Sequence, residues 1–75
     1  MKIDAEVKIV KSTNEETLKT GSIIEVTIDP DYIDDYDEVI TSIENRIYDD
    51  YGLSLWNREN FIVLNESEIC DKIFS

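Results

Sequence analysis

The sequence is poor in the residues on which metal sites and disulfides depend. Its 75 residues contain no histidine, one cysteine, one proline and two glycines. Cys70 has no second cysteine to pair with, so an internal disulfide is excluded and a reducing compartment is expected. Zinc sites need several histidine or cysteine ligands, so this composition excludes zinc as well.

Long apolar runs and clusters of basic residues are also missing. Neither a signal peptide nor a membrane span is evident, so we expect a soluble, cytoplasmic protein with one domain over residues 1–75. Seven Lys and Arg residues stand against eighteen Asp and Glu residues, a formal net charge of −11 at pH 7. Direct binding to nucleic acid or to an anionic membrane needs clustered cations, so neither is expected.

The first third of the chain has the pattern of two half-buried strands. Residues 2–11 alternate between apolar and charged side chains, and residues 22–29 repeat the alternation. The polar connection between them contains Gly21, which can adopt a turn conformation that other residues avoid. We therefore expect a β-hairpin that ends before Pro30, because proline has no N–H to donate to a neighbouring strand.

A helical period follows the predicted hairpin. From Asp34 to Tyr51, apolar residues recur every three or four positions, which predicts an amphipathic helix. Asp34 is the expected N-cap, with Asp37 as a weak capping-box partner, and Gly52 lies where a glycine often ends a helix. The predicted apolar stripe consists of Tyr36, Ile40, Ile43, Ile47 and Tyr51.

The C-terminal part is less regular. Residues 61–64 form a short apolar run, interpreted as a strand covered on both faces. Residues 65–74 fit either a final helical turn capped by Asn65 or an extended edge. The predicted fold is therefore α+β in the order β-β-α-β with an undecided last segment, one amphipathic helix packing on a short antiparallel sheet. In the helical alternative the inward-facing residues are Ile69, Ile73 and Phe74.

Half of the acidic residues lie in residues 29–51, where nine acids face Arg46 alone. Acids in the first turn of a helix are stabilised by its unpaired N–H groups and its dipole. Asp49 and Asp50 lie in the last predicted turn, where the same dipole disfavours anions. A helix that is acidic at both ends breaks a local rule, and such breaks tend to occur where function has been selected.

The helical period predicts that many of these acids face solvent, opposite the apolar stripe, along about 25 Å. Duplex DNA presents one negative charge per about 1.7 Å, so the predicted surface is sparser but has the same sign and a similar length. All four tyrosines fall in the same segment, and tyrosine is common in binding hot spots. The predicted partner-binding residues, called the acidic surface below, are Asp31, Tyr32, Asp34, Asp35, Glu38, Glu44, Tyr48, Asp49 and Asp50.

Other chemistries fit the sequence less well. An EF-hand loop starting at Asp29 would need Gly and Glu where the chain has Asp34 and Ile40, so only a loose Ca²⁺ or Mg²⁺ site stays open. The chain has no Gly-rich phosphate loop, no Ser-His-Asp set and no Cys-His pair, so neither catalysis nor a cofactor is expected.

These patterns predict a protein that inhibits a basic partner, such as a nucleic-acid-binding protein or a nuclease, by imitating a DNA or RNA phosphate backbone. In composition the chain resembles the small acidic DNA-mimic inhibitors of phages and mobile elements, which act on restriction, repair or CRISPR effectors. It also resembles the acidic immunity proteins and antitoxins that neutralise nucleases. A third interpretation is an interaction module whose apolar patch surrounds Trp56, with Leu53 and Leu55. The sequence leaves the partner's identity and the oligomeric state open.

Overall fold

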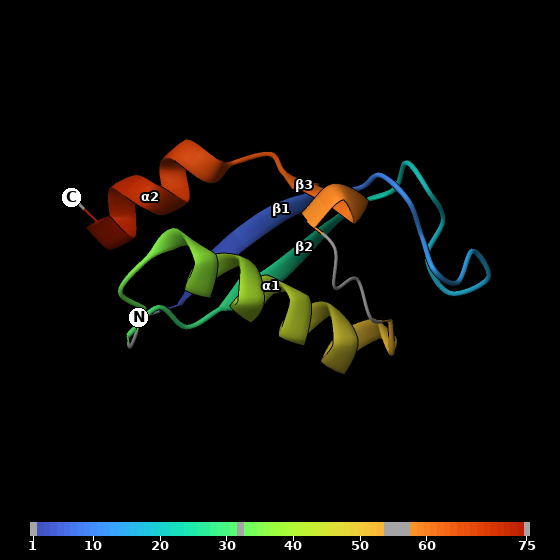
Figure 1. The fold of residues 1–75 in the computed structure, drawn as a ribbon, viewed down its shortest axis with the longest axis horizontal. Coiled ribbons are helices and arrows are strands. Elements are labelled where there is room, and N and C mark those ends of the chain that lie inside the picture. Colours follow the sequence, from blue (N-terminus) through green and yellow to red (C-terminus); the bar gives the residue numbers. More distant parts are fainter. Residues whose placement is uncertain (1, 32, 54–57, 75) are drawn as a thin grey trace.

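The computed structural model describes residues 2–31, 33–53 and 58–74. It is an α+β fold with a three-stranded antiparallel sheet in the order β2-β1-β3 and two helices (Figure 1). The predicted order of two strands, a helix and a strand is followed by a second helix, which the sequence pattern left undecided. The elements are β1 (Ile3–Ile9), β2 (Ile23–Ile28), α1 (Tyr36–Tyr51), a 3-10 turn (Arg58–Asn60), β3 (Phe61–Val63) and α2 (Glu66–Phe74).

The predicted hairpin is confirmed. β1 alternates strictly between buried and exposed residues, and it pairs with β2 in a register that sets Ile3 opposite Ile28. Gly21 has a φ of +89°, a region that favours glycine, and its N–H donates to the Ile9 carbonyl at 2.6 Å. The regular alternation on β1 therefore fixes which face of the sheet carries the core.

The N-terminus of α1 is capped one residue later than the sequence pattern predicted. Asp35, not Asp34, is the N-cap: its Oδ1 accepts the Glu38 N–H at 2.9 Å. Glu38 Oε2 in turn accepts the Asp34 N–H at 3.1 Å. The prediction of Asp34 as the N-cap was wrong. Its expected partner, Asp37, has a shorter side chain than Glu38, and it is Glu38 that reaches back to the residue before the cap. At the other end Gly52 has a φ of +70°, and its N–H donates to the Tyr48 carbonyl, as expected for a C-terminal glycine.

The apolar stripe of α1 packs against the sheet. Ile40, Ile43 and Ile47 are buried, and Tyr36 and Tyr51 are partly buried against them. Val39 is fully buried as well, although it was not assigned to the stripe. A helix that lies flat on a sheet buries a wider arc than one row of side chains, which brings the residue beside the stripe into the core.

The C-terminal segment differs from two expectations. β3 is covered on one face only, because Ile62 is 52% exposed, so the prediction of cover on both faces was wrong. Residues 66–74 are helical, with Ile69 fully buried and Ile73 partly buried. Phe74, predicted to face inward, is 43% exposed because it lies in the last turn.

Asn65 joins α2 to the sheet. Its Oδ1 accepts the Glu6 N–H at 2.9 Å, and its Nδ2 donates to the Asp4 carbonyl at 2.9 Å. β3 ends at Val63, and the Asn65 side chain then makes hydrogen bonds to the β1 backbone of the kind that a longer β3 would make. Asn65 also occupies the cap position that the sequence pattern assigned to it, because it directly precedes α2 and its carbonyl accepts the Ile69 N–H at 3.1 Å.

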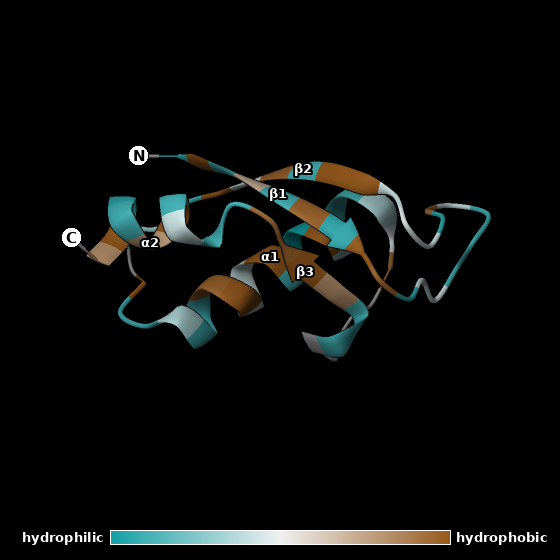
Figure 2. Cartoon of the chain, turned by 90° about the horizontal axis from the view of Figure 1, so that it is seen from above, coloured by the Kyte–Doolittle hydropathy of each residue, from teal (hydrophilic) through white to brown (hydrophobic). Residues whose placement is uncertain are grey.

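Both helices lie on the same side of β1 and β2, and the other face of these strands is open to solvent (Figure 2). Apart from Phe61, the buried core is aliphatic, and within the described residues no polar or charged side chain is buried. Among the same residues, no helix is both long enough and apolar enough to cross a membrane.

Candidate functional site

The residues of the acidic surface lie on α1 and in the loop before it. Tyr48 is 57% exposed and Glu44 is partly buried, while Tyr32 lies outside the described residues. The remaining acids of this surface are exposed to solvent on α1 or in the loop before it. These exposed acids are Asp31, Asp34, Asp35, Glu38, Asp49 and Asp50.

At the N-terminal end of α1, carboxylates also stabilise the backbone. Asp35 and Glu38 accept the two capping hydrogen bonds described above, and Asp29 Oδ1 accepts the Asp31 N–H at 3.2 Å. Carboxylates at this end are favoured by the helix dipole by about 0.3–1 kcal/mol each. Folding therefore explains part of the charge at this end, and the same side chains stay accessible to a partner.

At the C-terminal end of α1, no such explanation applies. The last turn of Tyr36–Tyr51, all of which is described, contains no basic residue, yet Asp49 and Asp50 lie there. Arg46 Nε lies 3.2 Å from Asp50 Oδ2, and both side chains are well exposed. Exposed pairs of this spacing contribute about 0.3–0.5 kcal/mol, which offsets only part of the cost of two anions at this end.

Glu44 differs from the other acids of the surface. Partial burial raises the pKa of its carboxyl, because the charged form loses water. A cation brought close by a partner would stabilise the charged form of this group.

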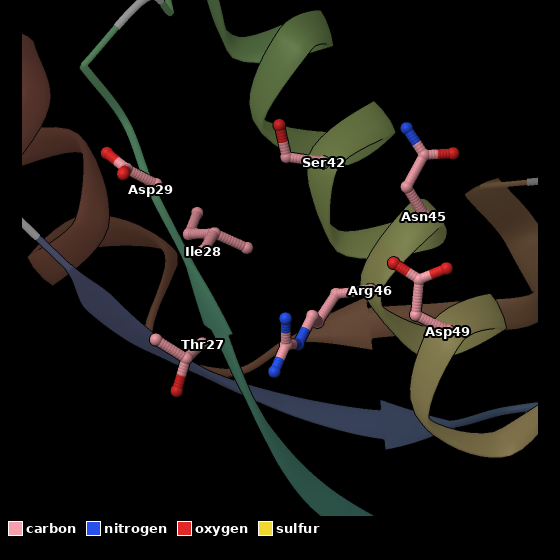
Figure 3. A pocket seen from close by; sticks show the side chains of 7 residues that line it. All are labelled: Thr27, Ile28, Asp29, Ser42, Asn45, Arg46 and Asp49. Carbon is pink, nitrogen blue, oxygen red and sulfur yellow. The ribbon is translucent and has the colours of Figure 1, made fainter.

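A shallow polar pocket of about 240 Å³ is lined by residues of α1 and of the edge strand β2. Ser42, Asn45 and Asp49 project from one side of α1, and the Arg46 side chain reaches from the helix toward Thr27 on β2 (Figure 3). The remaining lining residues are Ile28 and Asp29.

A second cavity of about 330 Å³ adjoins the end of β2 and is lined by Lys2, Arg46 and Asp29, among others. The edge of the acidic surface that faces β2 is thus bordered by two cations. The sequence signalled this only through Arg46, the one base within residues 29–51.

The chemistry of this arrangement is that of a charged contact surface. Its carboxylates are in water or partly in water, and within the described ranges no three Cys, Asp or Glu side chains converge on a point where a metal ion could bind. Of the alternative apolar patch, Leu53 is buried, whereas Leu55 and Trp56 lie outside the described residues.

No protein-family model, no curated protein and no solved structure matches the chain.

Proposed function

We propose that the protein binds a basic surface on a nucleic-acid-binding protein or nuclease, and that its acidic surface takes the place of the phosphate backbone there. The partner is inhibited because the site that would hold DNA or RNA is occupied. Tyr48 adds an exposed aromatic contact that can pack against Arg or Lys of the partner.

The observation that carries this proposal is the acidity of α1 at both ends. Over its 16 residues, about 24 Å long, acids at the first turn are favoured by the helix and acids at the last turn are not. Cations of a partner would offset the charge of Asp49 and Asp50, which Arg46 offsets only in part. Binding would then offset the unfavourable position of two anions at the C-terminal end of α1, which folding does not require.

The net charge supports binding over catalysis. A chain with a charge of −11 attracts a basic partner over distance, which raises the association rate and makes it sensitive to salt. Acid–base catalysis by carboxylates requires a substrate held in a concave, water-excluding site. The exposed position of the α1 acids suits a protein–protein contact instead.

Inhibition of a host or phage effector and neutralisation of a toxic nuclease would use the same surface. The two roles differ in the partner and not in the chemistry of the contact. Identification of the partner therefore decides between them.

The test is competitive elution from the immobilised protein. A cell lysate is passed over it, and retained proteins are eluted with a DNA duplex of about 20 base pairs at constant ionic strength. Basic DNA- or RNA-binding proteins should elute with the duplex at a much lower concentration than with polyglutamate of equal charge. Retained proteins that the duplex does not displace would contradict the proposal.

A further inference from the structure

The open face of the sheet has an apolar patch that the core does not use. Ile23 on β2 is 63% exposed, Ile62 on β3 is 52% exposed, and Leu64 just after β3 is 47% exposed. Six large apolar side chains are exposed among the described residues, and these are three of them. Single exposed apolar residues are ordinary, but a group of them on one flat face indicates an interaction site.

The register places this patch beside charges of both signs. Lys8 on β1 lies between Ile23 and Ile62, with which it pairs on either side. Glu6 lies between Glu25, its partner on β2, and Leu64, whose N–H donates to the Glu6 carbonyl at 2.7 Å. Across the three strands, the open face therefore has one row of Ile23, Lys8 and Ile62. The neighbouring row consists of Glu25, Glu6 and Leu64.

We propose that this face binds a second copy of the chain, so that two sheets pack face to face about a two-fold axis. The axis lies between the two sheets, perpendicular to β1 and level with Val7. Each Lys8 then lies opposite Glu6 of the other copy, each Ile62 opposite Leu64, and each Ile23 opposite Glu25. Such an interface is self-complementary, as a two-fold contact requires. Stacked sheets lie about 10 Å apart, a distance that these side chains can fill.

The distribution of charge selects a second copy over a strongly basic partner at this face. The strands expose Lys8 here against Asp4, Glu6 and Glu25, so this face has a much smaller excess of acid than residues 29–51, where nine acids stand against one base. Most of the surplus charge lies in residues 29–51, where nine acids stand against Arg46 on α1 and in the loop before it. α1 lies on the other side of the sheet.

The like charges at Glu6 and Glu25 supply a second argument. They are directly opposite in the β1–β2 register, an arrangement that destabilises a sheet. The neighbouring carboxylate of Asp4 accepts the Thr27 hydroxyl at 2.8 Å and is thereby satisfied within the chain. Lys8 of a second copy would relieve the Glu6–Glu25 repulsion.

This inference goes beyond the proposed function and does not depend on it. Because α1 and the open face lie on opposite sides of the sheet, a dimer would keep two acidic surfaces exposed on its outer sides. It could then engage a partner that itself has two equivalent basic sites.

The first experiment is sedimentation equilibrium of the full chain from about 10 µM to about 1 mM. The expected mass rises from that of one chain to that of two, and dimerisation strengthens with NaCl because salt screens the repulsion between two acidic molecules. Ile62→Ser should raise the dissociation constant by about tenfold or more. Phe74→Ser, which changes an apolar residue exposed at the end of α2, should leave it unchanged.

The second experiment tests the register with charge changes. Lys8→Glu alone and Glu6→Lys alone each place like charges opposite each other and should weaken self-association. A mixture of the two variants places opposite charges at both contacts and should form the heterodimer in preference to either homodimer.

A mass of one chain at every concentration would overturn the inference. So would a dimer that Ile62→Ser and Phe74→Ser weaken equally, or a mixture of charge variants with no preference for the heterodimer.

Discussion

At the scale of single residues, Asn65 makes the contacts that the sequence pattern did not reveal. Both polar atoms of its side chain bond to the β1 backbone, to Glu6 and Asp4, which are about sixty positions away in the chain. A local capping pattern makes Asn65 a plausible helix cap, but only the folded sheet places two backbone groups within its reach. Contacts of this kind depend on tertiary structure and have no signature in the neighbouring sequence.

Asn65→Ala should lower the free energy of unfolding by about 1–3 kcal/mol, because it removes two hydrogen bonds to the β1 backbone, each of which contributes about 0.5–1.5 kcal/mol. Urea unfolding followed by circular dichroism measures this change. Asn45→Ala is the matched control, since Asn45 is exposed on α1, and it should change stability by about 0.5 kcal/mol or less. Equal losses in the two variants would show that the Asn65 bonds contribute nothing.

At the scale of elements, the strands and the long helix were predictable and their details were not. The alternation of β1 and the 3.6-residue period of α1 each extend over seven or more residues, so one unusual residue does not obscure them. β3 has three residues, too few to show by pattern alone which of its faces is covered. The start of α1 was misplaced by one residue because two adjacent aspartates fit the same capping pattern.

The two aspartates allow a direct test of the cap. Asp35→Ala should destabilise the protein by about 0.5–2 kcal/mol, whereas Asp35→Asn, which keeps the accepting oxygen, should recover most of the loss. Asp34→Ala should have a smaller effect than Asp35→Ala, because Asp34 contributes its backbone N–H to the capping bonds. Thermal melts at pH 7 give the comparison, and a larger loss for Asp34→Ala would restore the original assignment.

At the scale of the whole molecule, the composition predicted an excess of acid and the fold determines where it lies. The acidic surface was predicted from the helical period alone, and its exposed members lie on α1 or in the loop before it. The alternation in residues 2–11 and 22–29 predicted that β1 and β2 have one open face, and the structure confirms it. The open face of β3 was not predicted, because its residues are apolar throughout and the run was interpreted as covered on both faces. The function assigned to the acidic surface stays a proposal.

Repulsion among the acids should make stability depend on salt and pH. The melting temperature should rise with NaCl, and it should rise as the pH falls from 7 toward 5. Glu44 adds to the second effect: its pKa is raised in the folded state, so folding gains stability as the pH falls through that raised value.

Glu15 acts in the opposite direction, but at lower pH. The hydrogen bonds from Thr20 lower the pKa of its carboxyl, so its contribution is lost only as the pH falls below the ordinary value of 4.5. Scanning calorimetry at low protein concentration measures these trends. A melting temperature that stays constant or falls under both treatments would show that the acids are compensated within the chain.

The most direct test of the central claim is the affinity of the retained partner for two variants of equal charge. Asp34→Lys/Asp49→Lys reverses the acidic surface at both ends and spares the Asp35–Glu38 cap, while Glu16→Lys/Glu68→Lys makes the same charge change at exposed positions outside α1 and outside the open face of the sheet. In titration calorimetry we expect the first variant to lose at least about a hundredfold in affinity and the second about tenfold or less. Equal losses would mean that net charge alone drives binding, and an unchanged affinity for the first variant would contradict a role for the acidic surface.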